Sequence, residues 1–302
     1  YVATFVGGCV SVVAGTAGQV VLTQLVRREQ LVEAHGKNRI AGSIAEIAGP
    51  GAAGALVRVA GAPLAIAANA LLVLGSVAML RRLRIEEPLP EPGKARFWPQ
   101  LKEGVRFVAG ERLLLSMALA VGSWQVFQTC AMATQVLFAT RVLGLDEFQV
   151  GLCVACAGFG TVAAGSLGHR LARRMGSGAA LIVGMALSGV GWLQLAFAPA
   201  GSASVAAFVI MEFCFGASVV LIFSSMLALR QSITPRTMLA RMTSTMRWLT
   251  LFPAWPGMLL GGTLAERYGL RVPFAVGGVG ALTLALVLWR ASAIRVARVP
   301  SA

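Results

Sequence analysis

Two carboxylates interrupt stretches of the chain that are otherwise apolar. Glu46 lies within residues 40–60 and Glu212 within residues 204–229, whereas the other acids lie in polar segments or at the ends of apolar ones. An ionised carboxylate is costly in apolar surroundings, so such residues usually face a cavity and often pass protons. Glu46 and Glu212 are therefore predicted to hold and release a proton. The alternative for each is an acid kept neutral by burial and hydrogen-bonded to a neighbour.

A row of amides marks another apolar stretch, residues 113–140. Gln125, Gln128 and Gln135 are spaced i, i+3 and i+10, which places them close to one face of a helix, and Trp124 adds aromatic surface. Apolar surface with a few amides is typical of a cavity that binds amphipathic molecules. Hydrogen bonding between membrane helices would use the same residue types, so both interpretations stay open.

The composition identifies the class of protein to which these residues belong. Of the 302 residues, 57% are hydrophobic and 13% charged, and the mean hydropathy is +0.77. Soluble domains have about 45–50% apolar and about 25% charged residues. We therefore expect an all-α, polytopic membrane protein. The net charge of +14 is attributed to loop arginines that fix topology, and no nucleic-acid binding is expected.

The sequence contains no Ser-His-Asp grouping, metal-ligand cluster or phosphate-binding loop that rises above chance. Cys153 and Cys156 form a C-x-x-C pair, but inside an apolar segment and without a second pair, so they are expected to fill the core. Neither enzymatic activity, nor a cofactor, nor a metal is therefore predicted.

Nine segments approach or exceed the roughly 20 apolar residues that a membrane helix needs. They are residues 2–26, 40–60, 63–80, 113–140, 149–167, 178–198, 204–229, 242–264 and 272–288. A Gly-Pro pair, Gly49 and Pro50, is expected to break the second segment, and residues 61–63 are expected to form a tight turn. A similar small-residue pattern returns at residues 256–262, which suggests an internal repeat.

Residues 81–112 form the longest polar stretch and are interpreted as a connection between two halves. The predicted division is residues 1–80, three membrane helices; residues 81–112, the central loop; and residues 113–302, a six-helix bundle. Within the loop, residues 97–108 predict a surface helix with an apolar face. That face would contain Phe97, Leu101, Val105 and Val108.

The distribution of basic residues predicts which side of the membrane each loop occupies. Of the 26 lysines and arginines, only Arg58, Arg141, Arg267 and Arg271 fall in the turns and segment ends of one side. The positive-inside rule then places the C-terminus and the central loop in the cytoplasm of a multi-pass protein of the cell inner membrane.

Three sequence motifs resemble the major facilitator superfamily. Gly49-Pro50-Gly51 with Gly54 resembles the glycine-proline motif in the fifth helix of drug antiporters. Residues 165–174 (GSLGHRLARR) resemble the second copy of the cytoplasmic loop motif Gly-x-Leu-Ala-Asp-Arg-x-Gly-Arg-Arg. Here His169 stands where that motif has Asp, which puts in doubt the gating ion pair that the Asp would support. The matching motif residues are Gly165, Arg170, Arg173 and Arg174.

The third match is narrower. Residues 28–34, and residues 230–235 together with residues 239–242, resemble bacterial exporters of the enterobactin-exporter and macrolide-efflux type. This resemblance implies export of small amphipathic molecules such as drugs, macrolides or siderophores, in exchange for protons, by a protein that is a monomer at full length. The nine segments correspond to helices four to twelve of the family, so the first three helices are expected to be missing. The alternative is a membrane sensor or assembly partner that does not transport.

Arg241 and Arg247 flank the start of the eighth apolar segment. They are interpreted mainly as topology signals whose side chains extend to the lipid headgroups. The alternative is a gating ion pair with another cytoplasmic loop.

Overall fold

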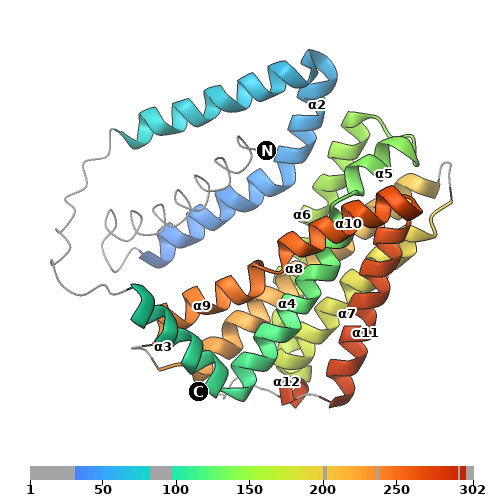
Figure 1. The fold of residues 1–302 in the computed structure, drawn as a ribbon. Coiled ribbons are helices and arrows are strands. Elements are labelled where there is room, and N and C mark those ends of the chain that lie inside the picture. The colour runs from blue at the N-terminus through green and yellow to red at the C-terminus, as the bar shows by residue number, and fades with distance from the viewer. Residues whose placement is uncertain (1–30, 82–96, 200–202, 236–237, 292, 297–302) are drawn as a thin grey trace.

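The computed structural model describes residues 31–81, 97–199, 203–235, 238–291 and 293–296. These residues form helices and connecting turns without a strand (Figure 1), so the predicted all-α fold is confirmed. The helices are α2 (Leu31–Leu80), α3 (Phe97–Gly110), α4 (Arg112–Met132), α5 (Gln135–Arg141), α6 (Glu147–Met175), α7 (Ser177–Ala196), α8 (Ala203–Ile233), α9 (Leu239–Leu251), α10 (Ala254–Tyr268), α11 (Val272–Ala291) and α12 (Ala293–Val296).

Six stretches within the described helices are long and apolar enough to cross a membrane. They cover all or nearly all of the third to seventh and the ninth predicted segments. Of the second segment they include only residues 48–60, which share the stretch Ala48–Leu80 with the third. The first predicted segment, residues 2–26, lies outside the described residues. Nearly every large apolar side chain after the bend in α2 is exposed, from Leu64 to Leu80. A helix that is apolar all round and unburied is suited to lipid rather than to water.

The bend in α2 occurs at Gly61, where the turn was predicted. Gly61 has φ 79° and ψ 161°, a backbone conformation that residues with a Cβ rarely adopt, and Pro63 begins the next helical stretch. By contrast, the break expected at Gly49 and Pro50 was wrong. The helix continues through Pro50, and Gly61 is the position with non-helical dihedral angles.

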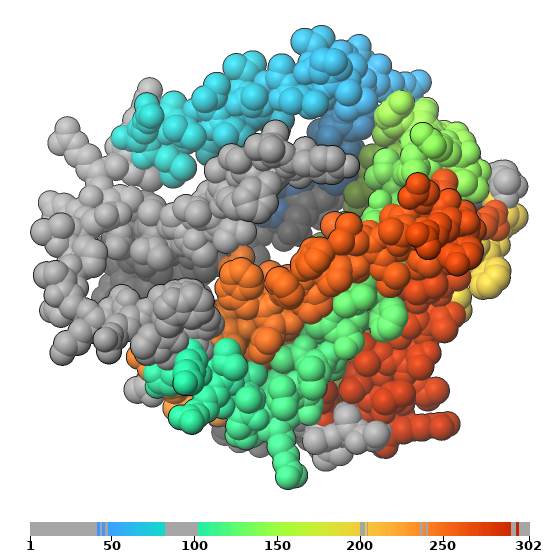
Figure 2. All heavy atoms as spheres, in the orientation of Figure 1, coloured from blue at the N-terminus to red at the C-terminus, as the bar shows by residue number. Residues whose placement is uncertain are grey.

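The eighth predicted segment, residues 242–264, is divided between α9 and α10, which follow one another across the face shown in Figure 2. Pro253 lies at the junction and Pro256 follows in the first turn of α10. Each proline lacks the N–H that would bond the carbonyl four residues earlier, so the helical hydrogen bonds to the carbonyls of Leu249 and Phe252 are missing. The predicted segment is therefore two helices separated by a short break at Phe252 and Pro253.

The motif at residues 165–174 is helical rather than a loop. Helix α6 continues to Met175, and Gly176, with φ 93°, makes the turn into α7. Arg173 and Arg174 lie in the last turn, where cations interact favourably with the carbonyl end of the helix.

Close approaches at glycines give the relative directions of the helices. Gly160 lies against Phe213 and Gly168 against Leu221, so α6 and α8 run parallel. Gly54 lies against Glu147 and Gly151 against Pro50, so α2 and α6 run antiparallel. Both directions agree with the order of crossings predicted from the sequence.

The predicted surface helix in the central loop is confirmed as α3. Its predicted apolar face is only partly correct: Val108 is buried, but Val105 is exposed, and the side chains of Phe97 and Leu101 lie outside those that the structure describes. Gly104 is the buried residue one turn before Val108, and it lies against Arg241 and Thr245 of α9. The face is shifted because α9 approaches along the glycine.

Candidate functional site

Glu212 of α8 and Gln135 of α5 form a buried polar pair. Glu212 is 1% exposed and Gln135 is 8% exposed. The Gln135 Nε2 donates a hydrogen bond to Glu212 Oε1. Gln135 is the first residue of α5, just after a short interruption at Ala133 and Thr134 that separates α5 from α4. Both residues were predicted from the sequence, but their contact with each other was not.

The amide suits either protonation state of the acid. An ionised carboxylate accepts a hydrogen bond from the amide N–H, and a protonated carboxyl can donate one to the amide oxygen. The Glu212 side chain therefore keeps a partner before and after a proton moves. Such a pair can hold and release a proton without leaving a buried charge wholly unpaired.

A cavity of about 270 Å³ adjoins this pair. It is bordered by helices of both predicted halves, because Pro50 comes from α2 and the other lining residues come from the second half. The remaining residues are Met132, Gln135, Val154, Ala157, Gly158, Thr161, Glu212, Phe215, Gly216 and Val219. The lining is mostly apolar, with the amide, the acid and one hydroxyl as its polar groups.

Glu46, the second predicted acid, lies on α2 one helical turn before Pro50. Its backbone is part of the helix, but its side chain lies outside what the structure describes. Its proposed part in proton handling stays a prediction.

Trp124 and Gln128 of α4 form two buried bridges to α7. The Trp124 Nε1 donates to Ser188 Oγ at 2.8 Å, and the Trp192 Nε1 donates to Gln128 Oε1 at 2.8 Å. All four residues are buried. For Trp124 and Gln128 this arrangement favours helix–helix bonding over a cavity wall. Gln125 is half-buried, and its backbone carbonyl accepts a bond from Thr129.

Sequence reasoning missed Ser188 and Trp192. A signal existed: they are spaced i, i+4 on the sixth apolar segment, as Trp124 and Gln128 are on the fourth. Two parallel helices with matching i, i+4 pairs can form two such bridges at successive turns. Trp192 also stacks on Phe274 of α11, with ring centroids 5.7 Å apart.

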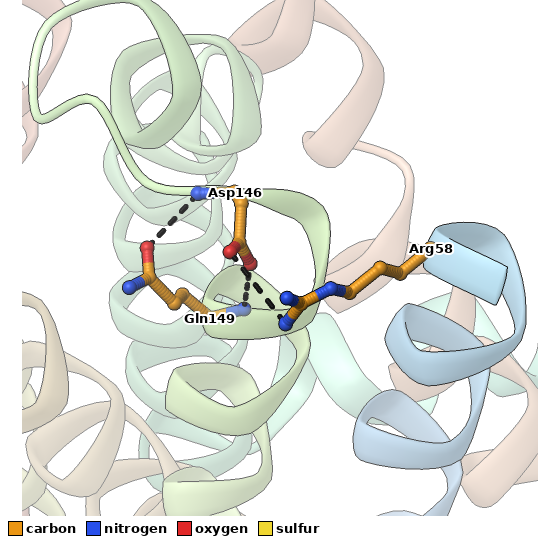
Figure 3. A network of polar contacts seen from close by, with 3 residues as sticks. All are labelled: Arg58, Asp146 and Gln149. Carbon is orange, nitrogen blue, oxygen red and sulfur yellow. Dashed lines mark hydrogen bonds and ion pairs between the residues drawn. The ribbon is translucent and has the colours of Figure 1, made fainter.

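The two predicted halves meet at a polar network beside the N-terminus of α6 (Figure 3). Asp146 caps α6, since its Oδ1 accepts from the Gln149 N–H at 2.8 Å, while the Asp146 N–H donates to Gln149 Oε1 at 3.0 Å. Arg58 of α2 reaches the other Asp146 oxygen at 3.9 Å and lies over the Phe148 ring at 5.7 Å. Arg58 is one of the four basic residues on the side of the membrane where lysine and arginine are predicted to be rare, and Asp146 is its carboxylate partner.

Glycines allow α2 and α6 to touch beside this network. A Cβ at Gly54 would come within 2.7 Å of the Glu147 carbonyl oxygen, and one at Gly151 within 2.5 Å of the Pro50 carbonyl oxygen. The other end of α2 differs: Ala41, Gly42, Ile44, Ala45, Ala48 and Gly49 are exposed. Figure 1 shows α2 meeting α6 near its bend and diverging from it toward residue 31.

The remaining motif residues lie at the opposite end of the bundle from Arg58. Gly165, Arg170, Arg173 and Arg174 are exposed on α6. Arg241 Nη1 forms an ion pair with Glu103 Oε2 of α3 at 2.6 Å. This contact matches the ion-pair alternative for Arg241, whereas Arg247 is exposed on α9. Any gating role of Arg241 stays a prediction.

Comparison with known proteins adds one finding. The sequence profile of the Major Facilitator Superfamily matches residues 1–252 and again residues 129–301. No curated protein matches the chain. Members of this superfamily are transporters that cross the membrane many times, as the apolar helices of this chain can. The chain therefore belongs to the Major Facilitator Superfamily.

Proposed function

We propose that the protein exports small amphipathic molecules in exchange for protons by alternating access. The observation that carries the proposal is the buried Glu212–Gln135 pair beside a cavity bordered by helices of both halves. A protonatable group at that position can couple its own proton binding to the relative position of the halves.

Three further features support the proposal. The cavity lining is largely apolar, as amphipathic cargo requires. The halves, residues 1–80 and 113–302, touch at the Arg58 end of α2. Near the other end of α2, Ala41, Gly42, Ile44, Ala45, Ala48 and Gly49 are exposed, which is the asymmetry that rocking bundles need. Export as the direction, and drugs, macrolides or siderophores as cargo, rest on the resemblance to exporters.

The protein is placed in the cell inner membrane as a monomer with a cytoplasmic C-terminus. That orientation rests on the bias of lysine and arginine toward the loops at the Arg170 end of the bundle. The lipid bilayer, the proton and the small-molecule cargo are then its partners.

The test is efflux by the full-length protein, with the three expected preceding helices present, in proteoliposomes with an imposed pH gradient. A panel of dyes, macrolides and siderophores identifies a transported molecule first. Glu212→Gln keeps the side-chain shape and removes the titratable group, so we expect gradient-driven efflux to fall at least tenfold while cargo binding persists.

Glu266→Gln is the matched control, because Glu266 is an exposed acid on α10. It should leave efflux unchanged. Glu46→Gln, tested in parallel, decides whether Glu46 also takes part in coupling efflux to protons. Unchanged gradient-driven efflux in both the Glu212 and the Glu46 variants would refute proton coupling through these acids. No efflux of any panel molecule by the unaltered protein would favour the sensor alternative.

A further inference from the structure

A second, larger hollow lies between α6 and α8, near the end of the bundle that carries the motif residues. Its volume is about 490 Å³. Its walls are apolar apart from two arginines. The lining residues are Ala163, Ala164, Leu167, Gly168, Arg170, Leu171, Arg174, Phe213, Ala217 and Leu221, and we call it the α6–α8 groove.

The groove is separate from the cavity of about 270 Å³ beside the Glu212–Gln135 pair, which we call the Glu212 cavity. It uses Phe213, Ala217 and Leu221 of α8, spaced four residues apart along one face. The Glu212 cavity uses Glu212, Gly216 and Val219, which face a different side of the same helix. The two hollows therefore lie on different sides of α8, and the α6–α8 groove is not an extension of the proposed cargo site.

The groove has a buried floor and an exposed rim. Ala164, Ala217 and Leu221 form a small buried cluster at the floor. Leu167 is 57% exposed and Phe213 is 41% exposed at the rim. An exposed apolar rim on a membrane helix is suited to contact with an acyl chain, because water would not wet it favourably.

Charge is concentrated at one end of the groove. Ala163, Leu167, Arg170 and Arg174 follow one face of α6 at i, i+4, i+7 and i+11, so both guanidinium groups lie beyond the apolar part. No ion pair joins Arg170 or Arg174 to a carboxylate in the part of the chain that the structure describes. Residues 165–176 contain no acid, since His169 occupies the position where the family motif has Asp.

We propose that the α6–α8 groove binds one anionic phospholipid. The headgroup phosphate lies between Arg170 and Arg174, and an acyl chain follows Leu167, Ala163 and Phe213 toward the middle of the bilayer. Arginine forks match phosphate geometry, and basic pockets between helices on the cytoplasmic side are suited to anionic headgroups. The side of the membrane rests on the predicted topology, but the site does not depend on the cargo or on proton coupling.

The dimensions agree with this occupant. From Arg170 to Ala163 the helix rises about 10 Å, close to the length of eight methylene groups, and this stretch offers only apolar side chains and glycine on the groove face. Free phosphate would use the arginines and leave the apolar stretch empty. A lipid uses both.

The experiment measures lipid binding to the purified full chain in detergent by native mass spectrometry. Phosphatidylglycerol is titrated first, with phosphatidylcholine of the same acyl chains for comparison and inorganic phosphate as competitor. We expect phosphatidylglycerol to bind more tightly than phosphatidylcholine. Millimolar inorganic phosphate should not displace it. In Arg170→Gln/Arg174→Gln, its affinity should fall roughly thirtyfold, the loss expected of two arginines beside an anionic headgroup.

The matched control is Arg173→Gln/Arg247→Gln, which removes two exposed cations from the same end of the protein outside the groove. It should keep the affinity of the unaltered protein. An equal loss of affinity in both double variants would overturn the proposal, because the lipid would then be attracted by the overall positive charge of this end of the protein rather than by the groove. Equal affinity for the two lipids, or displacement by inorganic phosphate, would also overturn it.

A second variant tests the acyl part without removing charge. Ala163→Phe fills the groove at its apolar end, where the alanine is half-buried. It should weaken phosphatidylglycerol binding. Affinity that is unchanged in this variant would exclude the acyl path. Elution as a single folded species in size-exclusion chromatography establishes that each variant retains its fold.

Discussion

Single glycines set how closely the helices of the second half approach. Gly216 of α8 lies against the backbone of Ala157 on α6, with no room for a Cβ, whereas Gly165 of α6 has nothing within 4 Å. Replacing Gly216 with alanine must push α6 and α8 apart.

We expect Gly216→Ala to destabilise the protein by about 1–3 kcal/mol, the usual cost of overpacking. Gly165→Ala is the control, because it adds the same methyl group to a helix in open space and should be neutral or slightly stabilising. The measurement is the fraction of folded protein remaining after heating in detergent. If half of the protein were lost at the same temperature in the two variants, the close contact at Gly216 would be contradicted.

At this scale the sequence identified the polar residues but not their partners. Glu212 and Gln135 stood out because polar groups are rare in apolar segments. Their contact depends on how α5 packs beside α8, which periodicity within one segment does not specify. The same limit explains why the sequence left two interpretations open for Gln128, a cavity wall or a helix–helix bond, whereas in the structure it accepts a hydrogen bond from Trp192 of a different helix.

At the scale of elements, the contact between α2 and α6 joins the two predicted halves. Its closest points are Gly54 and Gly151. The adjoining Arg58–Asp146 ion pair is largely exposed, so it stabilises the contact between the helices by at most about 1 kcal/mol. Steric fit at the glycines therefore dominates this contact.

We expect Gly151→Leu to separate α2 from α6 and Gly51→Leu, which enters open space, to leave them in place. Spin labels on two exposed residues, Val59 of α2 and Arg141 at the end of α5, report the separation by pulsed electron resonance. A longer distance in Gly151→Leu alone supports the contact. The same distance distribution in both variants would show that the glycines do not hold the halves together.

Prolines show why element boundaries were harder to predict than elements. Pro50 stands alone, and α2 remains helical around it. Pro253 and Pro256 stand three residues apart, so the hydrogen bonds to the carbonyls of Leu249 and Phe252 are both missing. The helical path is interrupted there, between the end of α9 at Leu251 and the start of α10 at Ala254. The number of missing bonds per turn, rather than the presence of a proline, separates the two cases.

For the whole molecule, the crossing order follows from segment length and the loop charges. The parallel α6–α8 and antiparallel α2–α6 pairs agree with it. The absolute side of each loop rests on the positive-inside rule.

Single cysteines in a background free of the five native ones test the sidedness. Membrane-impermeant maleimide added to intact cells should label a cysteine at Arg267 and should not label one at Lys102 or His169. All three positions are exposed in the structure. Permeabilised cells are the control, and all three should then react. Labelling of position 102 from outside would show that the orientation in the membrane is opposite to the predicted one.

Ala41, Gly42, Ile44, Ala45, Ala48 and Gly49 of α2 are exposed, while the stretch from Pro50 to Gly61 is buried or half-buried at several positions. With the predicted sidedness, these exposed residues lie toward the cytoplasmic end of α2, which is the end that diverges from α6. An antibody fragment raised against the exposed stretch from the cytoplasmic side would hold the molecule in this one state. Turnover would then stop, while equilibrium binding of cargo from the cytoplasm would survive.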